Sequence, residues 1–113
     1  MPLGYGMQFA RTHVERVVRE SSIENYLEAQ CAALRVPCKK LKGDNGWFDR
    51  VVFWPGGRPS LVELKKPKGW RYEPLQQRTH AEYAALGYDV HVLKTKEEVD
   101  KFIRKNVARL TYP

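Results

Sequence analysis

Apolar side chains recur at helical spacing in the first third of the chain. In the run from 22 to 36 these side chains are Ile23, Tyr26, Leu27, Cys31 and Leu34. The step Val36-Pro37 ends the run, because a residue before proline disfavours helical backbone. Ser21, with Glu24 three residues later, fits a capping box and is the expected N-cap. Residues 9–18 repeat the spacing and suggest a further helix, either separate from this one or continuous with it.

The middle of the chain has the shorter patterns of β-strands. A short strand is expected at 38–42, followed by a turn at 43–46. Residues 48–54 are rich in aromatic and β-branched side chains and predict a second strand. The turn at 55–57 leads back into a third strand at 61–65. The second and third strands should therefore form a hairpin.

The C-terminal part alternates helix, strand and helix. A helix is predicted at 75–86, closed by Gly87 as a C-cap, and a strand at 89–93. The last predicted helix, 96–107, places four apolar residues on one face: Val99, Phe102, Ile103 and Val107. The order α, β, β, β, α, β, α predicts an α/β fold with a mixed sheet of three to four strands flanked by helices. No repeat or linker divides the chain, so residues 1–113 form a single domain.

A candidate catalytic site lies in the predicted hairpin. Asp49 is followed fourteen residues later by Glu63-Leu64-Lys65. The period of two along a strand places Glu63 and Lys65 on one face and Leu64 on the other. Two carboxylates are hard oxygen ligands for Mg²⁺ or Mn²⁺, and such a metal activates water and stabilises charge on a phosphate. With the lysine ammonium to neutralise developing charge, the spacing predicts a metal-dependent nuclease.

A solvated ion pair on a strand would give the same Glu-x-Lys pattern. Three features favour the catalytic interpretation. The strand is otherwise apolar, Asp49 follows Gly46-Trp47-Phe48, and the basic segment 65–71 comes directly after the strand. The combination is more specific than any one of these features.

The overall charge agrees with an anionic partner. The chain has 113 residues, with 20 Lys and Arg against 13 Asp and Glu, a net charge of +7. This is the footprint expected of a protein that neutralises phosphates. Cys31 and Cys38 have no second pair at zinc-finger spacing and are expected to be reduced. No apolar run of about 18 residues and no signal-like N-terminus is present, which predicts a cytoplasmic protein without a membrane partner.

Six basic residues flank the proposed site in the sequence and are expected to bind nucleic acid. They are Lys39, Lys40, Lys42, Lys66, Lys68 and Arg71. Trp47, Trp70 and Tyr72 interleave with them and could stack on unpaired bases. A solvated basic surface with the aromatic residues in the core is the alternative, and Trp47 fits the core better than Trp70. His80 could approach the active site one turn beyond Gln76, but a lone helix histidine is more often a surface or packing residue, which is the expectation here.

The chain resembles a stand-alone VRR-NUC domain, a branch of the PD-(D/E)XK nuclease superfamily. The matching motifs are Glu20-Ser21-x-Ile23-Glu24, Gly46-x-x-Asp49-Arg50, Pro55-Gly56-Gly57-Arg58, Val62-Glu63-Leu64-Lys65, Leu75-Gln76 and Leu86-Gly87-Tyr88. They occur in the family's order and extend over most of the chain. One departure is Phe48, where the family usually has proline before the aspartate.

The resemblance implies a restriction-endonuclease-like core and a set of site residues. Asp49, Glu63 and Leu64 would bind Mg²⁺ or Mn²⁺, with Lys65 as the catalytic cation and Gln76 as a supporting polar residue. A helix glutamate would complete the site.

Two glutamates are candidates for that last position. On a helical wheel Glu20 lies within the apolar face and Glu24 lies near its edge. The capping-box interpretation leaves Glu20 outside the helix, and a similar stretch in archaeal junction resolvases favours Glu24. Either residue could instead be a helix-start carboxylate favoured by the helix dipole. Both candidates remain open.

The sequence therefore favours a structure-specific DNA endonuclease. The expected substrate is branched DNA, especially the four-way (Holliday) junction, cut by a homodimer whose two identical sites match two equivalent strands. The expected setting is a bacterial cell or a phage-infected host. The alternatives are a non-catalytic nucleic-acid-binding module, or a nuclease that acts on flaps, duplex DNA or RNA.

Overall fold

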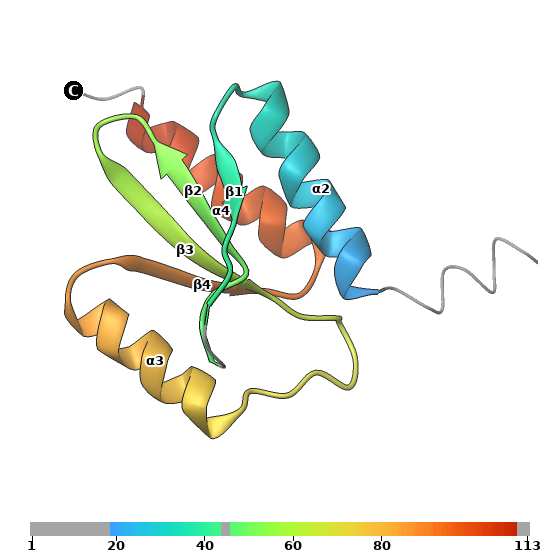
Figure 1. The fold of residues 1–113 in the computed structure, drawn as a ribbon. Coiled ribbons are helices and arrows are strands. Elements are labelled where there is room, and N and C mark those ends of the chain that lie inside the picture. The colour runs from blue at the N-terminus through green and yellow to red at the C-terminus, as the bar shows by residue number, and fades with distance from the viewer. Residues whose placement is uncertain (1–18, 44–45, 111–113) are drawn as a thin grey trace, which may run out of the picture.

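The computed structural model describes residues 19–43 and 46–110 (Figure 1). Its elements are α2 (Glu20–Ala33), β1 (Cys38–Lys40), β2 (Arg50–Trp54), β3 (Arg58–Leu64), α3 (Pro74–Ala85), β4 (Asp89–Leu93) and α4 (Lys96–Leu110). This order agrees with the order predicted from residue 20 onward. The further helix suggested at 9–18 lies outside the described residues.

The four strands form one mixed sheet in the order β1-β2-β3-β4. The pairs β1–β2 and β2–β3 are antiparallel, whereas β3–β4 is parallel. The predicted hairpin and α/β fold are thus confirmed. β3 begins at Arg58, three residues earlier than predicted, and β2 begins at Arg50, so that Asp49 stands just before its strand. β1 is shorter than predicted, although Leu41 still bonds to the Asp49 carbonyl oxygen at 2.9 Å.

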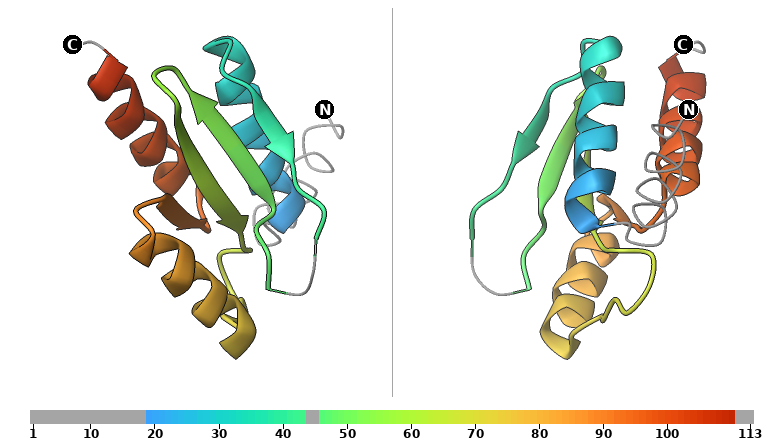
Figure 2. Two further views of the ribbon diagram at one scale, coloured as in Figure 1. Left: turned by 60° about the vertical axis from the view of Figure 1, so that its left-hand side comes forward. Right: turned by 90° about the vertical axis from the view of Figure 1, so that its right-hand side faces the viewer.

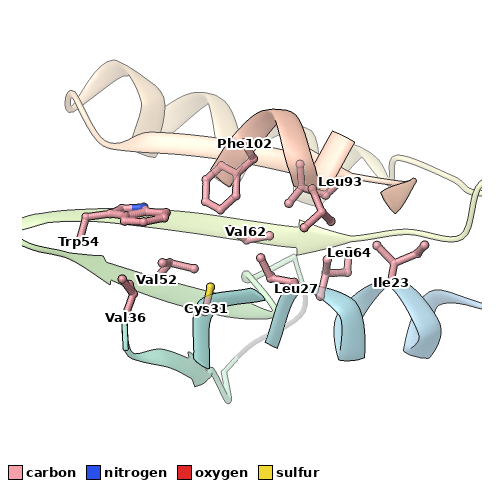
Figure 3. Close-up of a cluster of buried hydrophobic side chains, with 11 residues drawn as sticks. Ile23, Leu27, Cys31, Val36, Val52, Trp54, Val62, Leu64, Leu93 and Phe102 are labelled. Atoms are coloured by element: carbon pink, nitrogen blue, oxygen red, sulfur yellow. The ribbon is translucent and has the colours of Figure 1, made fainter. Parts of the chain in front are cut away.

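Helices cover the two faces of the sheet unequally. α2 and α4 lie side by side against one face (Figure 2). The larger core cluster fills this layer, with Val52, Val62 and Leu64 facing Leu27 and Phe102 (Figure 3). On the other face a smaller cluster of Phe48, Val51 and Leu61 packs against Tyr83 of α3. Successive residues of β2 and β3 point to opposite faces of the sheet and both faces are covered, so the strand register fixes the direction of the side chains near Asp49 and Glu63.

The first helix begins earlier than the capping pattern predicts. Its N-cap is Arg19, whose carbonyl oxygen accepts a hydrogen bond from Ser22 N at 3.0 Å. The prediction of Ser21 as N-cap is wrong, because Ser21 is already helical and no side-chain cap forms. Glu20 is consequently inside the helix, in its first turn, where the helix dipole favours a carboxylate.

Both α2 and α3 end in the same left-handed turn. After α3, Gly87 adopts φ +97°, and Tyr88 N bonds to Tyr83 O at 3.1 Å. This confirms Gly87 as the residue that closes the helix, since glycine adopts this backbone without steric cost. After α2 the corresponding position is Arg35, with φ +58°.

Candidate active site

Asp49 is held at the open end of the β2–β3 hairpin. Its main-chain N bonds to Val62 O at 3.0 Å. Its carboxylate Oδ2 accepts a hydrogen bond from Leu64 N at 2.8 Å. The carboxylate is therefore turned toward the end of β3, where Glu63 lies.

Glu63, Lys65 and Gln76 form one hydrogen-bonded group. Glu63 lies near the end of β3 and is 4% exposed. Gln76 Nε2 donates to Glu63 Oε2 at 2.8 Å, and Lys65 Nζ donates to Gln76 Oε1 at 3.0 Å. Lys65 Nζ is also 3.3 Å from Glu63 Oε2. The side chains of Glu63 and Lys65 converge as the strand period predicts, and Gln76 of α3 bridges them.

The second oxygen of Glu63 is buried and unpartnered. Oε1 has no hydrogen-bond partner among the described residues. Burial, followed by the charge of Asp49, raises the pKa of Glu63 from 4.5 to about 7, although Lys65 and Gln76 oppose this rise. Burial also raises the pKa of Asp49. Two carboxylates that repel each other in a partly dry site would both be stabilised in their charged forms by a bound cation.

The two candidate glutamates of α2 have different partners. Glu24 Oε2 accepts a hydrogen bond from Arg50 Nε at 2.8 Å, and Glu28 Oε2 accepts one from Arg50 Nη2 at 2.7 Å. The Glu20 side chain makes no hydrogen bond or ion pair with any other described residue. Partial burial and the charge of Asp49 nevertheless raise its pKa, and Lys65 opposes the rise. Glu20 therefore shares the electrostatic field of the site.

Glu24 is not remote from the site, since its charge also contributes to the raised pKa of Asp49. Its carboxylate is nevertheless paired with Arg50, whose side chain is only 11% exposed. Sequence reasoning did not identify this ion pair. The signal was available, because an arginine within the apolar run of β2 needs a buried acidic partner.

Comparison with known proteins places these residues in a family. No protein-family profile matches the chain. The chain is 37% identical over 84 residues to "Putative nuclease p44" of Acyrthosiphon pisum secondary endosymbiont phage 1, an alignment that covers 73% of this chain and 89% of that protein. A solved structure described as "VRR_NUC domain" matches with a TM-score of 0.71 and 30% identity, over 78% of this chain and 97% of the other.

The chain belongs to the VRR-NUC family. The resemblance drawn from the motifs is thus confirmed, and VRR-NUC domains are nuclease domains, so nucleic acid is the implied substrate class. The same match confirms the α/β class of the fold.

The departure from the VRR-NUC pattern at Phe48 has a structural reason. Phe48 is 3% exposed and stacks on the His80 ring of α3, with centroids 4.5 Å apart and planes at 10°. The aromatic ring therefore fixes the chain before Asp49 by packing, at a position where a proline would restrict the backbone. His80 is a packing residue, as expected.

The proposed metal site fits a cation that needs few protein ligands. Among the described residues, no group of three or more His, Cys, Asp or Glu side chains could hold a metal ion by itself. Mg²⁺ is commonly bound by one or two carboxylates, with water and substrate phosphates as further ligands. Asp49 and the unpartnered Oε1 of Glu63 match this donor set. Leu64 can contribute only through its backbone.

The six basic residues form two exposed groups beside these carboxylates. Lys39 and Lys40 belong to β1 and Lys42 follows it, whereas Lys66, Lys68 and Arg71 lie between β3 and α3. The charge of Lys40 opposes the raised pKa of Asp49, and the charge of Lys66 opposes that of Glu20, so one lysine of each group reaches the site electrostatically.

The aromatic residues near the site divide as the sequence suggested. Trp47 packs on Phe48 and Tyr83, whereas Trp70 is 37% exposed.

Among residues 19–43 and 46–110, no helix combines the length and apolarity that crossing a membrane requires.

Proposed function

We propose that this VRR-NUC domain is an Mg²⁺- or Mn²⁺-dependent endonuclease that hydrolyses phosphodiester bonds in DNA. The observation that carries the proposal is the buried, unpartnered Oε1 of Glu63, which lies in a group with Asp49 and Lys65. A carboxylate oxygen left without a donor in a dry site is costly unless a cation binds there.

Each residue has a distinct part in this reaction. Asp49, Glu63 and the backbone carbonyl oxygen of Leu64 would hold the cation, which when bound stabilises charge on the phosphate and lowers the pKa of a bound water. Lys65 keeps its ammonium near the scissile phosphate, because Gln76 and Glu63 hold it from one side. There it can donate to a phosphate oxygen or orient the attacking water.

Glu20 is the proposed third carboxylate of the site. It makes no hydrogen bond or ion pair within the described part of the chain, whereas Glu24 is bonded to Arg50. A carboxylate in the field of Asp49 and Lys65 can accept a proton from water or contribute to cation binding. Glu24 instead holds the helix against β2 through Arg50.

We infer further that the acting form is a homodimer and that its substrate is the four-way junction. A two-fold symmetric dimer presents two identical sites, and a four-way junction has two equivalent strands. A domain of 113 residues also has a small core of its own, which a dimer interface would extend. The exposed lysines on both sides of the site provide the charge for two phosphate backbones.

Cleavage assays on labelled DNA test these statements. Four-way junction, flap and plain duplex DNA are incubated with Mg²⁺, Mn²⁺ or EDTA, using the wild type, Asp49→Asn and the control Glu82→Gln, which changes an exposed carboxylate of α3. We expect paired symmetric nicks in the junction that require the metal and Asp49 but not Glu82. Metal-independent binding without cleavage would favour a binding module, and a monomer that cuts only flaps or duplex would exclude junction resolution.

A further inference from the structure

Residues 65–73 form the loop between β3 and α3 (Figure 1). This loop holds an exposed indole among cationic side chains. Trp70 is 37% exposed, although tryptophan is usually highly buried. Lys66, Lys68 and Arg71 of the same loop are also exposed. The loop starts directly at Lys65, so this surface adjoins the proposed active site.

Contacts on α3 hold this loop in place. The Tyr72 hydroxyl and His80 Nδ1 are hydrogen-bonded at 2.6 Å. Gln77 Nε2 donates to the Tyr72 carbonyl oxygen at 2.9 Å. His80 is 3% exposed and stacks on Phe48, the residue before Asp49. The position of Tyr72 is therefore fixed relative to Phe48, the residue before Asp49, through one hydrogen bond and one ring stack.

The indole of Trp70 is also oriented by its neighbours. Lys94 Nζ lies 4.9 Å from the ring centroid, a cation–π contact. The Tyr72 ring is 6.3 Å away at 53°. Neither contact buries the indole, so a flat aromatic surface stays available between positively charged groups.

We propose that this loop binds an unpaired nucleotide beside the scissile phosphate. Trp70 stacks on the base, while the cations of the loop bind the phosphate backbone: Lys66, Lys68 and Arg71. An indole can stack on a base only if a face of that base is free, which excludes an interior pair of a continuous duplex. The site therefore selects DNA with an unstacked nucleotide near the cut, as occurs at a single-stranded branch. A four-way junction, whose bases are all paired, would have to open at its branch point to occupy this site. This inference rests on the proposed nuclease function, since it defines the substrate class of that site.

Equilibrium binding in the inactive Asp49→Asn background, with EDTA, tests the proposal without cleavage. The probes are a DNA duplex with one single-stranded branch and the matched continuous duplex. We expect Trp70→Leu to weaken binding of the branched DNA about tenfold and that of the duplex less than about twofold. Trp70→Phe should restore most of the affinity, because phenylalanine can also stack.

Phe53→Leu is the matched control. Phe53 is a similarly exposed aromatic residue, at 47%, and it pairs with Pro59 at the opposite end of β3 from Glu63. Its removal should leave both affinities unchanged. If Trp70→Leu lowered the affinity for both DNAs equally, or lowered neither affinity, the proposal would be overturned. Thermal unfolding of each variant identifies any loss due to misfolding.

A double-mutant cycle gives the sharper test. Each unpaired nucleotide near the branch is replaced in turn by an abasic analogue. We expect one position at which the abasic replacement lowers the affinity of the protein with Trp70 about tenfold. At that position the same replacement should not lower the affinity of the Trp70→Leu variant any further. Additive losses at every position would contradict stacking. If the wild type cleaves no DNA but this coupling is found, the result contradicts the proposed nuclease function and supports the proposed nucleotide-binding loop.

Tyr72→Phe tests the anchoring of the loop. The substitution keeps the ring and removes only the hydroxyl that bonds to His80. We expect branched-DNA affinity to fall about threefold, in line with one lost hydrogen bond, with the Trp70 coupling reduced but present. An unchanged affinity and coupling would show that the loop does not need this anchor.

Discussion

Two carboxylates of the same sheet, Glu63 and Asp89, illustrate the difference between a site and a scaffold. Asp89, at the start of β4, accepts a hydrogen bond from Ser60 Oγ at 2.7 Å and contacts His91 Nε2 at 2.8 Å. Despite partial burial, the contacts with Ser60 and His91 lower the pKa of Asp89. Glu63 has one oxygen fully bonded and the other buried without a partner, and its pKa is raised. A carboxylate that serves the fold has partners for both oxygens within the chain, whereas Glu63 has one oxygen without a partner among the described residues, to which a cation could bind.

The largest expected effect comes from substituting the two carboxylates of this comparison, Glu63 and Asp89. Glu63→Gln should lower metal-dependent cleavage by more than about a thousandfold, since catalysis by a bound metal depends on its ligands. Asp89→Asn should leave the specific activity of the folded protein within about threefold and lower stability by about 1–3 kcal/mol, because a buried network loses a charged acceptor. Initial rates and thermal melts on both variants measure the two effects. Retained cleavage in Glu63→Gln would rule out its assigned role.

Lys65→Ala should reduce the rate of cleavage by about a hundredfold or more, as removal of a donor to transition-state charge does in other enzymes. Affinity should change less than about threefold, because Lys66, Lys68 and Arg71 still bind the backbone. Single-turnover rates and equilibrium binding separate these quantities. Lys101→Ala, which removes an exposed lysine of α4, is the control. A loss confined to affinity would make Lys65 only a phosphate contact.

The two glutamates of α2 should separate activity from stability. Glu20→Gln should lower the cleavage rate at least about tenfold with little change in the melting temperature, because it makes no hydrogen bond or ion pair within the described structure. Glu24→Gln should mainly lower stability, by about 1–3 kcal/mol, because Arg50 loses one of two acidic partners. Urea unfolding and rates on matched samples give both values. The reverse pattern would assign Glu24 to the catalytic site.

The smallest expected effect is the pH dependence of stability without metal. Since the pKa of Glu63 is raised from 4.5 to about 7, its contribution is fully present below pH 4.5 and is lost as pH rises toward 7, by at most about 3 kcal/mol. Asp89 has the opposite sign, because its lowered pKa gives stability that is lost as pH falls. Denaturant titrations at several pH values should show the neutral-side loss vanish in Glu63→Gln. A loss that persists in that variant belongs to another group.

Local patterns predicted the fold better than the site. The alternation in β3 placed Glu63 and Lys65 on one side, and Gly87 ended α3 as expected, because strand period and left-handed turns depend on adjacent residues. The prediction of Ser21 as N-cap was wrong, since the helix begins one residue earlier, at Glu20, with Arg19 as its N-cap. The local capping signal did not include that extension.

Contacts between distant segments could not be predicted in this way. The pairing of Arg50 with Glu24 joins β2 to α2, and only the packed structure brings them together. The hydrogen bond from the β3–α3 loop to His80 is similar, because the path of that loop has no periodic signal. The first contact pairs Glu24 rather than Glu20 with Arg50, and the second positions the loop that contains Trp70.

The hydrogen bond from Leu64 N to Asp49 Oδ2 makes the site observable without a substrate. An amide bonded to a carboxylate exchanges its hydrogen with solvent only when that bond opens. The exchange rate of the Leu64 amide therefore reports how often the Asp49 carboxylate leaves its position in the resting protein. The exchange rate of this one amide could therefore be compared across a series of metals or variants to follow the fluctuations of the Asp49 carboxylate.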